Sequence, residues 1–138
     1  MTLEQNKQSM KKFETMINTA DLNLANELIS PNAKFYTPVS PEPLVGGEGY
    51  LSVVHFLRSG FSDVKWKLEE MVAERNIVAV TWTCSGTHDG EFFGIKPTGK
   101  SFSACVMNFY YFDEEGKIVN DVAAEGMIAI LRAIGVCP

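Results

Sequence analysis

Two long apolar runs, IVAVTWTCSGTH (77–88) and SFSACVMNFYYF (101–112), decide the fold of this chain. Both are rich in β-branched and aromatic residues, which is typical of β-strands. Between them, Pro97-Thr98-Gly99-Lys100 has the composition of a turn, and no glycine-rich run leads into a helix as in a phosphate-binding loop. We therefore expect two long antiparallel strands joined as a hairpin.

The same period-two pattern continues on either side of this hairpin, in WKLEEMVAE (66–74) and KIVNDVAAE (117–125). Before position 64 most residues have helical spacing instead, apart from a short strand expected at AKFYT (33–37) and the proline-rich loop that follows it. A capping box at Thr2 and Gln5 begins one helix, Asp21 caps a second, and a third is expected over about 48–58. A short amphipathic helix follows the last strand and ends at Gly135.

Helices followed by a meander of strands predict an α+β fold. We expect the sheet to be strongly curved, with the three N-terminal helices on its concave face and a tapered interior. Residues 77–88 and 101–112 carry aromatic side chains on both strand faces. We therefore expect both faces of the sheet to be covered.

Composition limits the classes of function. The 138 residues suit a single domain, 1–138, and a net charge of -5 without a long basic segment argues against nucleic-acid or membrane partners. There is no apolar signal segment at the N-terminus and no run long enough to span a membrane. Three cysteines without metal-type spacing suit a reducing compartment, so we expect a cytoplasmic protein.

Several motifs resemble one family. They are SPNAKFYTP (30–38), LVGGEGY (44–50), GTHDGEFFGIKPTGKSF (86–102), FDEEGKIV (112–119) and ILRAIGV (130–136). In this order they are similar to the SnoaL-like polyketide cyclases of the nuclear transport factor 2-like superfamily. The resemblance implies a cone-shaped cystatin-like fold, a small-molecule cavity, no cofactor and a homodimer that pairs through the outer sheet face. Asn120-Asp121-Val122 stands where the family commonly has Glu-His-Trp.

Asp121 is the first candidate catalytic residue. It shares one strand face with Ala123 and Glu125, and a carboxylate in an apolar cavity has a raised pKa that suits a general base. The resemblance also implies an essential acid on this strand. The alternative is an aspartate at the strand edge that is solvated or bonded to the backbone.

His88 is the second candidate. The resemblance implies that it bonds a ligand oxygen or orients the acid, and the alternative is a histidine at the hairpin end that bonds the backbone. If the protein is an enzyme, we expect Asp121 and His88 to open into one cavity. One histidine with two carboxylates and no ligands at metal-type spacing does not match a metal site, so none is predicted.

Further residues are predicted to bind the ligand. Aromatic and flexible apolar side chains are typical of pockets for planar molecules, and the hydroxyl of a tyrosine needs a polar partner. Each apolar member has a plain core position as its alternative. The predicted ligand-binding residues are Tyr36, Phe56, Trp66, Trp82, Met107, Phe109 and Glu125.

The sequence thus favours a cofactor-independent cyclase or isomerase acting on a small hydrophobic polycarbonyl molecule. A carbon between two carbonyls is already acidic, so the protein need supply only a base, an apolar cavity and a hydrogen-bond donor. The alternative is a protein of the same fold that binds a small molecule without turnover.

Overall fold

The computed structural model describes residues 2–37, 40–124 and 127–136. Four strands form one antiparallel sheet in the order β3-β4-β5-β6, and two very short strands pair separately. The elements are α1 (Leu3–Thr19), α2 (Leu22–Leu28), β1 (Lys34–Phe35), β2 (Leu44–Val45), α3 (Gly46–Gly60), β3 (Lys65–Glu74), β4 (Ile77–Thr87), β5 (Ser101–Phe112), β6 (Ile118–Ala124) and α4 (Met127–Ala133).

The predicted helix starts are confirmed. The Thr2 hydroxyl accepts from the Gln5 backbone N–H and the Gln5 side chain accepts from the Thr2 N–H, which completes the capping box of α1. The Asp21 carboxylate accepts from the Leu24 N–H and begins α2. α3 starts two residues earlier than expected, at Gly46, whose φ is 69°. The short strand expected at 33–37 is confirmed as β1, and its partner β2 was not predicted.

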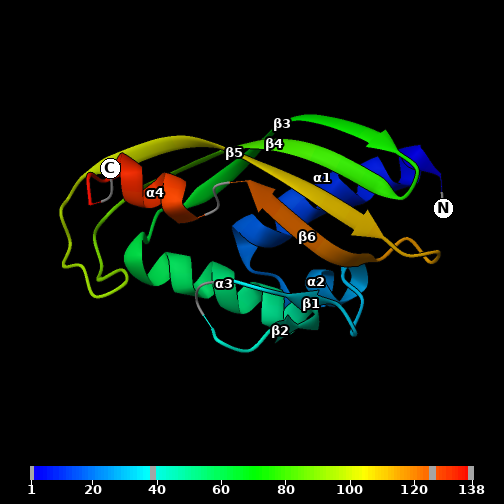
Figure 1. The fold of residues 1–138 in the computed structure, drawn as a ribbon, viewed down its shortest axis with the longest axis horizontal. Helices are drawn as coiled ribbons and strands as arrows, with labels where there is room; N and C mark the ends of the chain where they lie inside the picture. The colour runs from blue at the N-terminus through cyan, green and yellow to red at the C-terminus, as the bar shows by residue number, and fades with distance from the viewer. Residues whose placement is uncertain (1, 38–39, 125–126, 137–138) are drawn as a thin grey trace.

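The curved sheet arches over α1 and α3, and α4 lies against β5 at one end (Figure 1). In β4 every second residue from Val78 to Gly86 is buried, because these side chains point towards the helices. The matching inward set on β5 includes Val106 and Tyr110. Helices on one face of an antiparallel sheet make the predicted α+β fold, and the curved sheet and three N-terminal helices are confirmed.

Two groups of buried side chains pack between the layers. The larger surrounds Phe13 and Trp82, where α1, α2 and α3 meet the sheet. The smaller surrounds Phe61 and Phe92 near the end of α3, where α4 also packs. These two groups leave an internal space between them that the helices do not fill.

The outer face of the sheet is uncovered in the single chain. Met107 and Phe109 lie on this face with 53% and 49% of their surface exposed. Phe109 pairs with Ala79 on β4 and with Val122 on β6, and Ala79 pairs with Val72 on β3. These four residues form one row across the outer face of the sheet. The expectation that both faces are covered is therefore not met within one chain.

Candidate functional site

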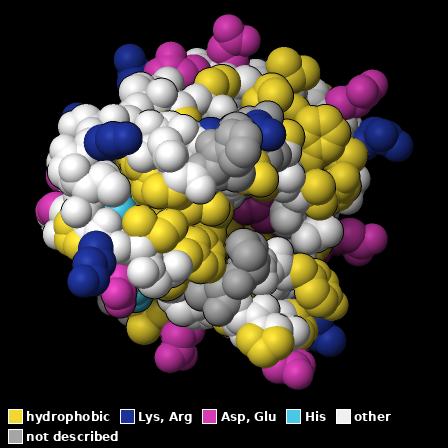
Figure 2. Space-filling model, turned by 60° about the vertical axis from the view of Figure 1, so that its left-hand side comes forward, with side chains coloured by type: hydrophobic (Ala, Val, Ile, Leu, Met, Phe, Trp, Pro, Cys, Tyr) yellow, Lys and Arg dark blue, Asp and Glu magenta, His cyan; other side chains and the backbone are white. Residues whose placement is uncertain are grey.

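A cavity of about 690 Å³ lies between the concave face of the sheet, α3 and α4. Figure 2 shows a hollow bordered by hydrophobic side chains, with acidic atoms visible inside it. Its described lining residues are Ile17, Phe35, Tyr36, Thr37, Tyr50, Val53, Val54, Leu57, Trp66, Trp82, Cys84, Phe93, Val106, Asn108, Tyr110, Asp121, Ala123, Met127, Ile128, Ile130 and Leu131. The size and the mostly apolar lining suit a drug-sized organic ligand.

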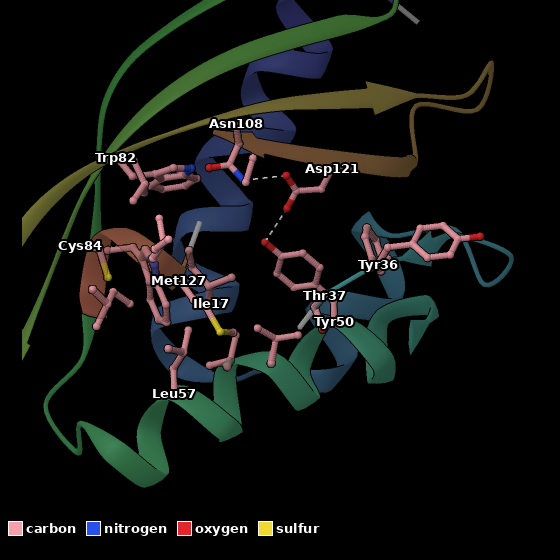
Figure 3. Close-up of a pocket in the computed structure, with 18 of the residues that line it drawn as sticks. Ile17, Tyr36, Thr37, Tyr50, Leu57, Trp82, Cys84, Asn108, Asp121 and Met127 are labelled. Atoms are coloured by element: carbon pink, nitrogen blue, oxygen red, sulfur yellow. Dashed lines mark hydrogen bonds between the residues drawn. The ribbon is translucent and has the colours of Figure 1, made fainter. Parts of the chain in front are cut away.

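Asp121 is the only acid or base among these residues that is charged at neutral pH. It projects from β6 into the cavity, and each of its oxygens accepts a hydrogen bond (Figure 3). The Tyr50 hydroxyl donates to Oδ2 at 3.0 Å and the Asn108 amide donates to Oδ1 at 2.6 Å. The two donors come from α3 and β5, so three elements together fix the orientation of the carboxylate.

Burial raises the pKa of Asp121 to about 6, while the hydrogen bonds from Asn108 and Tyr50 act against this rise. The side chain keeps some accessible surface because it faces the cavity. Protein atoms nevertheless surround it closely enough to disfavour the charged form. A carboxyl group with this pKa is largely ionised at neutral pH, and it is a stronger base than an ordinary aspartate.

Aromatic packing holds Tyr50 in place. Its ring meets Phe13 and Phe35 edge-to-face, at centroid distances of 5.2 and 5.0 Å. Burial first, and then the charge of Asp121, raise the pKa of the Tyr50 hydroxyl well above its usual value. Tyr50 therefore stays protonated and acts as a donor over the whole physiological range.

Tyr110 is a second buried hydroxyl in the cavity lining. It accepts a hydrogen bond from Trp82 Nε1 at 3.1 Å, and burial raises its pKa well above its usual value. The buried indole N–H of Trp82 therefore has the hydrogen-bond partner that such a group requires. The register pairs Tyr110 directly with Asp121 across β5 and β6.

His88 does not line this cavity. It is fully buried, and its Nδ1 lies 3.2 Å from the Thr98 backbone nitrogen and 3.0 Å from the Thr98 hydroxyl. Its ring lies 5.2 Å from that of Phe61, and its Nε2 has no hydrogen-bond partner. The expectation that His88 and Asp121 open into one cavity is wrong, because the Thr98 turn and the phenylalanine cluster enclose His88.

The predicted ligand-binding residues differ in where the structure places them relative to the cavity. Trp66 and Trp82 line the cavity as expected. Tyr36 belongs to the lining but is 78% exposed, and its side chain points away from Asp121 (Figure 3). Phe56 is absent from the described lining and packs against Phe92 and Phe93 instead.

Met107 and Phe109 do not line the cavity as predicted, because their side chains lie on the outer face of β5. The inward-facing neighbour between them is Asn108, which bonds Asp121. The error is one of strand face, since successive side chains of a strand point to opposite sides. Glu125 lies outside the described residues.

Sequence reasoning missed the three polar partners Tyr50, Asn108 and Tyr110. Asn108 was detectable as the one residue of the stretch 104–112 whose side chain is not mainly apolar or aromatic. Tyr50 gave no comparable signal, because it stands within a helix that is apolar over most of its circumference.

Within the described residues no three His, Cys, Asp or Glu side chains are grouped to hold a metal, and no helix is long and apolar enough to cross a membrane.

Comparison with known proteins identifies the family of this chain. The family model of the SnoaL-like polyketide cyclases matches residues 7–134. The chain belongs to this family. The sequence matches no curated protein.

Solved structures share the fold over the whole chain. TsrD from Streptomyces laurentii is 20% identical and superposes with a TM-score of 0.83, covering 99% of this chain and 98% of its own. IdmH from Streptomyces antibioticus, a candidate polyketide cyclase, is 27% identical with a TM-score of 0.76 over 96% and 99% of the two chains. AclR from Streptomyces galilaeus, a candidate hydroxylase, is 25% identical with a TM-score of 0.76 over 99% and 89%.

Proposed function

We propose that this SnoaL-like domain, residues 1–138, is a cofactor-independent cyclase or isomerase whose general base is Asp121. Its substrate is a small hydrophobic polycarbonyl molecule that fills the cavity. The observation that carries the proposal is a carboxylate with a pKa of about 6, fixed by Tyr50 and Asn108 in a mainly apolar cavity of about 690 Å³. Family membership and the likeness to IdmH support the same class of reaction.

The proposed reaction needs no group beyond the side chains and the substrate. Asp121 removes a proton from a carbon between two carbonyls, and the electron pair moves onto a carbonyl oxygen as an enolate. The carbon then attacks a second carbonyl of the same molecule, which closes a ring and leaves an alkoxide. Protonated Asp121 returns its proton to that alkoxide, so the enzyme ends the cycle unchanged.

Two features of the cavity favour this step. The Tyr50 hydroxyl donates its one proton to the carboxylate and so holds the base in place, while the Asn108 amide has a second N–H beside the one that Asp121 accepts. That second N–H can donate to an enolate oxygen that forms there. The apolar walls hold a flexible polycarbonyl chain in a folded pose, which brings the reacting carbons together. His88 has no part in the proposal, since it lies outside the cavity lining.

The test measures proton abstraction alone. In D₂O, 2-tetralone, an apolar bicyclic ketone with an acidic carbon, exchanges that proton for deuterium, which NMR follows directly. Asp121→Asn keeps the shape of the side chain and removes the base, so exchange should fall by about 10²-fold or more. Cys84→Ser, which changes another polar atom in the lining, is the matched control and should keep most of the activity.

The alternative is a non-catalytic binding protein of the same fold. It predicts that wild-type protein binds 2-tetralone without accelerating exchange above the rate in buffer. Asp121→Asn would then change neither quantity.

We further propose that the protein is a homodimer in the cytoplasm. The row Val72, Ala79, Phe109 and Val122, together with Met107, makes an apolar strip on the outer sheet face that an isolated chain leaves exposed. Burying such a strip against a second copy removes it from water. Sedimentation at micromolar concentration should show a dimer, and a monomer there would remove this part of the proposal.

A further inference from the structure

A tight turn within the loop between β4 and β5 carries an unusual residue. Phe92 and Ile95 exchange two backbone hydrogen bonds of 3.0 and 2.9 Å across the central pair Phe93-Gly94. Both central residues have positive φ, 50° for Phe93 and 75° for Gly94. A two-residue turn with positive φ at both centres favours Asn-Gly, because asparagine and glycine tolerate the left-handed region.

Phe93 is a poor choice for this position on two counts. A bulky residue at positive φ is a conformational outlier that costs free energy. In addition, 42% of its surface is exposed, so its ring contributes little to the core. Asparagine would satisfy the turn better and would also suit the solvent, so the local fold does not explain the phenylalanine.

The neighbouring Phe92 shows what an aromatic residue does for the fold here. It is fully buried and meets Phe61 edge-to-face at 4.9 Å. A Cβ added at Gly60 would lie only 3.0 Å from the Phe92 side chain, so the turn is closely seated against the end of α3. Phe92 therefore anchors the turn, and the anchored turn holds Phe93 at a fixed place.

That place is the rim of the cavity. Phe93 belongs to the lining, and its ring touches Phe56 and Phe92 edge-to-face at 5.1 and 4.8 Å. Like Phe93, Tyr36 and Ile128 both line the cavity and are exposed at the surface. An occupant of the cavity would meet these side chains as it entered.

We propose that Phe93 is a specificity-determining residue that packs its ring against a flat aromatic part of the ligand. In this proposal, the strained turn and the exposed ring serve ligand binding and not the stability of the fold. Asp121 is the only side chain of the described lining that is ionised at neutral pH, so the same cavity disfavours an anionic ligand. The orientation of the ligand, with its reactive end at Asp121, rests on the proposed function.

The first test compares a flat probe with a flexible one. Binding of 1-aminoanthracene, a planar uncharged tricycle, is followed by its fluorescence, and 2-dodecanone, a flexible chain, is measured by displacement. Phe93→Ala should weaken 1-aminoanthracene by about tenfold, because an aromatic pair and its buried area are lost. It should weaken 2-dodecanone by no more than about twofold, because a flexible chain has no flat face to stack. Equal losses for both probes, or no loss for the planar one, would overturn the proposal.

A second variant separates binding from folding. Phe93→Asn places the favoured residue in the turn and should raise the unfolding temperature by about 3 °C, while it weakens 1-aminoanthracene as Phe93→Ala does. Leu22→Ala, which removes another hydrophobic side chain with 45% exposure outside the lining, controls for the loss of exposed apolar surface and should change neither binding constant. A lower unfolding temperature in Phe93→Asn would show that the ring serves the fold, and would overturn the proposal.

The proposal and the proposed function can fail separately. Asp121→Asn should bind 1-aminoanthracene as the wild type does, since it leaves the apolar lining intact. If that variant keeps full exchange activity while Phe93→Ala loses the planar probe, the catalytic role of Asp121 is wrong and the role of Phe93 stands.

Discussion

His88 directly follows β4 and Asp121 lies on β6, yet the surroundings of these two polar residues differ in kind. His88 is fully buried beside Thr98 and Phe61, and its Nε2 has no hydrogen-bond partner. Asp121 has a donor on each oxygen and an open cavity in front of it. His88 is the more deeply buried of the two, so burial alone does not identify a site. A reactive group also needs partners that fix its orientation and room for a substrate.

The largest effect that tests this contrast is on stability. His88→Ala removes a filled ring position and the bonds to Thr98, so we expect the free energy of unfolding to fall by about 2–4 kcal/mol, as for other large-to-small changes in a core. Deuterium exchange of 2-tetralone, measured where the variant is fully folded, should stay within about twofold of the wild type. Urea unfolding gives the first quantity and NMR the second.

Asp121→Asn should show the reverse pattern, with activity lost and the fold kept. A fully folded His88→Ala protein with exchange reduced by about tenfold or more would contradict the contrast and return His88 to the reaction.

The sequence predicted the fold well because the two signals on which it depends are local. Capping at Thr2 and Asp21, and alternation over the four long strands, do not require knowledge of distant contacts. The short strand expected at 33–37 corresponds to β1, but its partner β2 was missed, because two residues leave too short a pattern to detect.

The site was predicted only in part, because strand face depends on register. Trp82 and Asp121 were placed correctly in the cavity, but Met107 and Phe109 were assigned to it from the same strand that presents Asn108 and Tyr110 inwards. Both faces of β5 are rich in apolar residues, so alternation cannot tell which one is inside. The register that settles it, with Trp82 opposite Val106, is set through the irregular connection 88–100, whose length does not correspond to a tight hairpin turn.

The second prediction concerns stability and pH. Asp121 has a pKa near 3.8 when unfolded and about 6 when folded, so between these values the folded state holds a proton that the unfolded state has released. Stability contributed by this group is therefore present below pH 4 and is lost as pH rises towards 6, by about 2 kcal/mol. Asp121→Asn cannot titrate, so the stability of the variant relative to wild type should rise by this amount between pH 4 and pH 7.

Exposed acids do not interfere with this measurement. Backbone and hydroxyl hydrogen bonds lower the pKa values of Asp63 and Asp89, so both act below the window of Asp121, and they are common to wild type and variant. Urea unfolding at four pH values between 4 and 7 gives the difference directly. A difference that does not change with pH would mean that Asp121 ionises in the folded protein as it does in water.

The smallest effect should come from Tyr50→Phe. The hydrogen bond from Tyr50 favours the ionised carboxylate, so its loss should raise the pKa of Asp121 further. Exchange activity requires the ionised base and should therefore rise with pH around a midpoint near 6 in the wild type. In Tyr50→Phe the midpoint should move up by about 1 pH unit, the lower end of the range for one hydrogen bond to a charged group.

Tyr110→Phe is the matched control, because it removes the same atom from the neighbouring tyrosine of the same cavity. The hydroxyl of Tyr110 accepts from Trp82 and makes no direct hydrogen bond to Asp121, so its loss should lower stability and leave the midpoint of the pH profile in place. Tyr50 and Tyr110 are the ionisable groups that face Asp121, from α3 and β5, and both stay neutral over this range. A shift of equal size in both variants would mean that the midpoint responds to cavity polarity in general. A shift confined to Tyr50→Phe would show that one oriented donor sets the basicity of Asp121 at the cavity, which the enclosed His88 does not line.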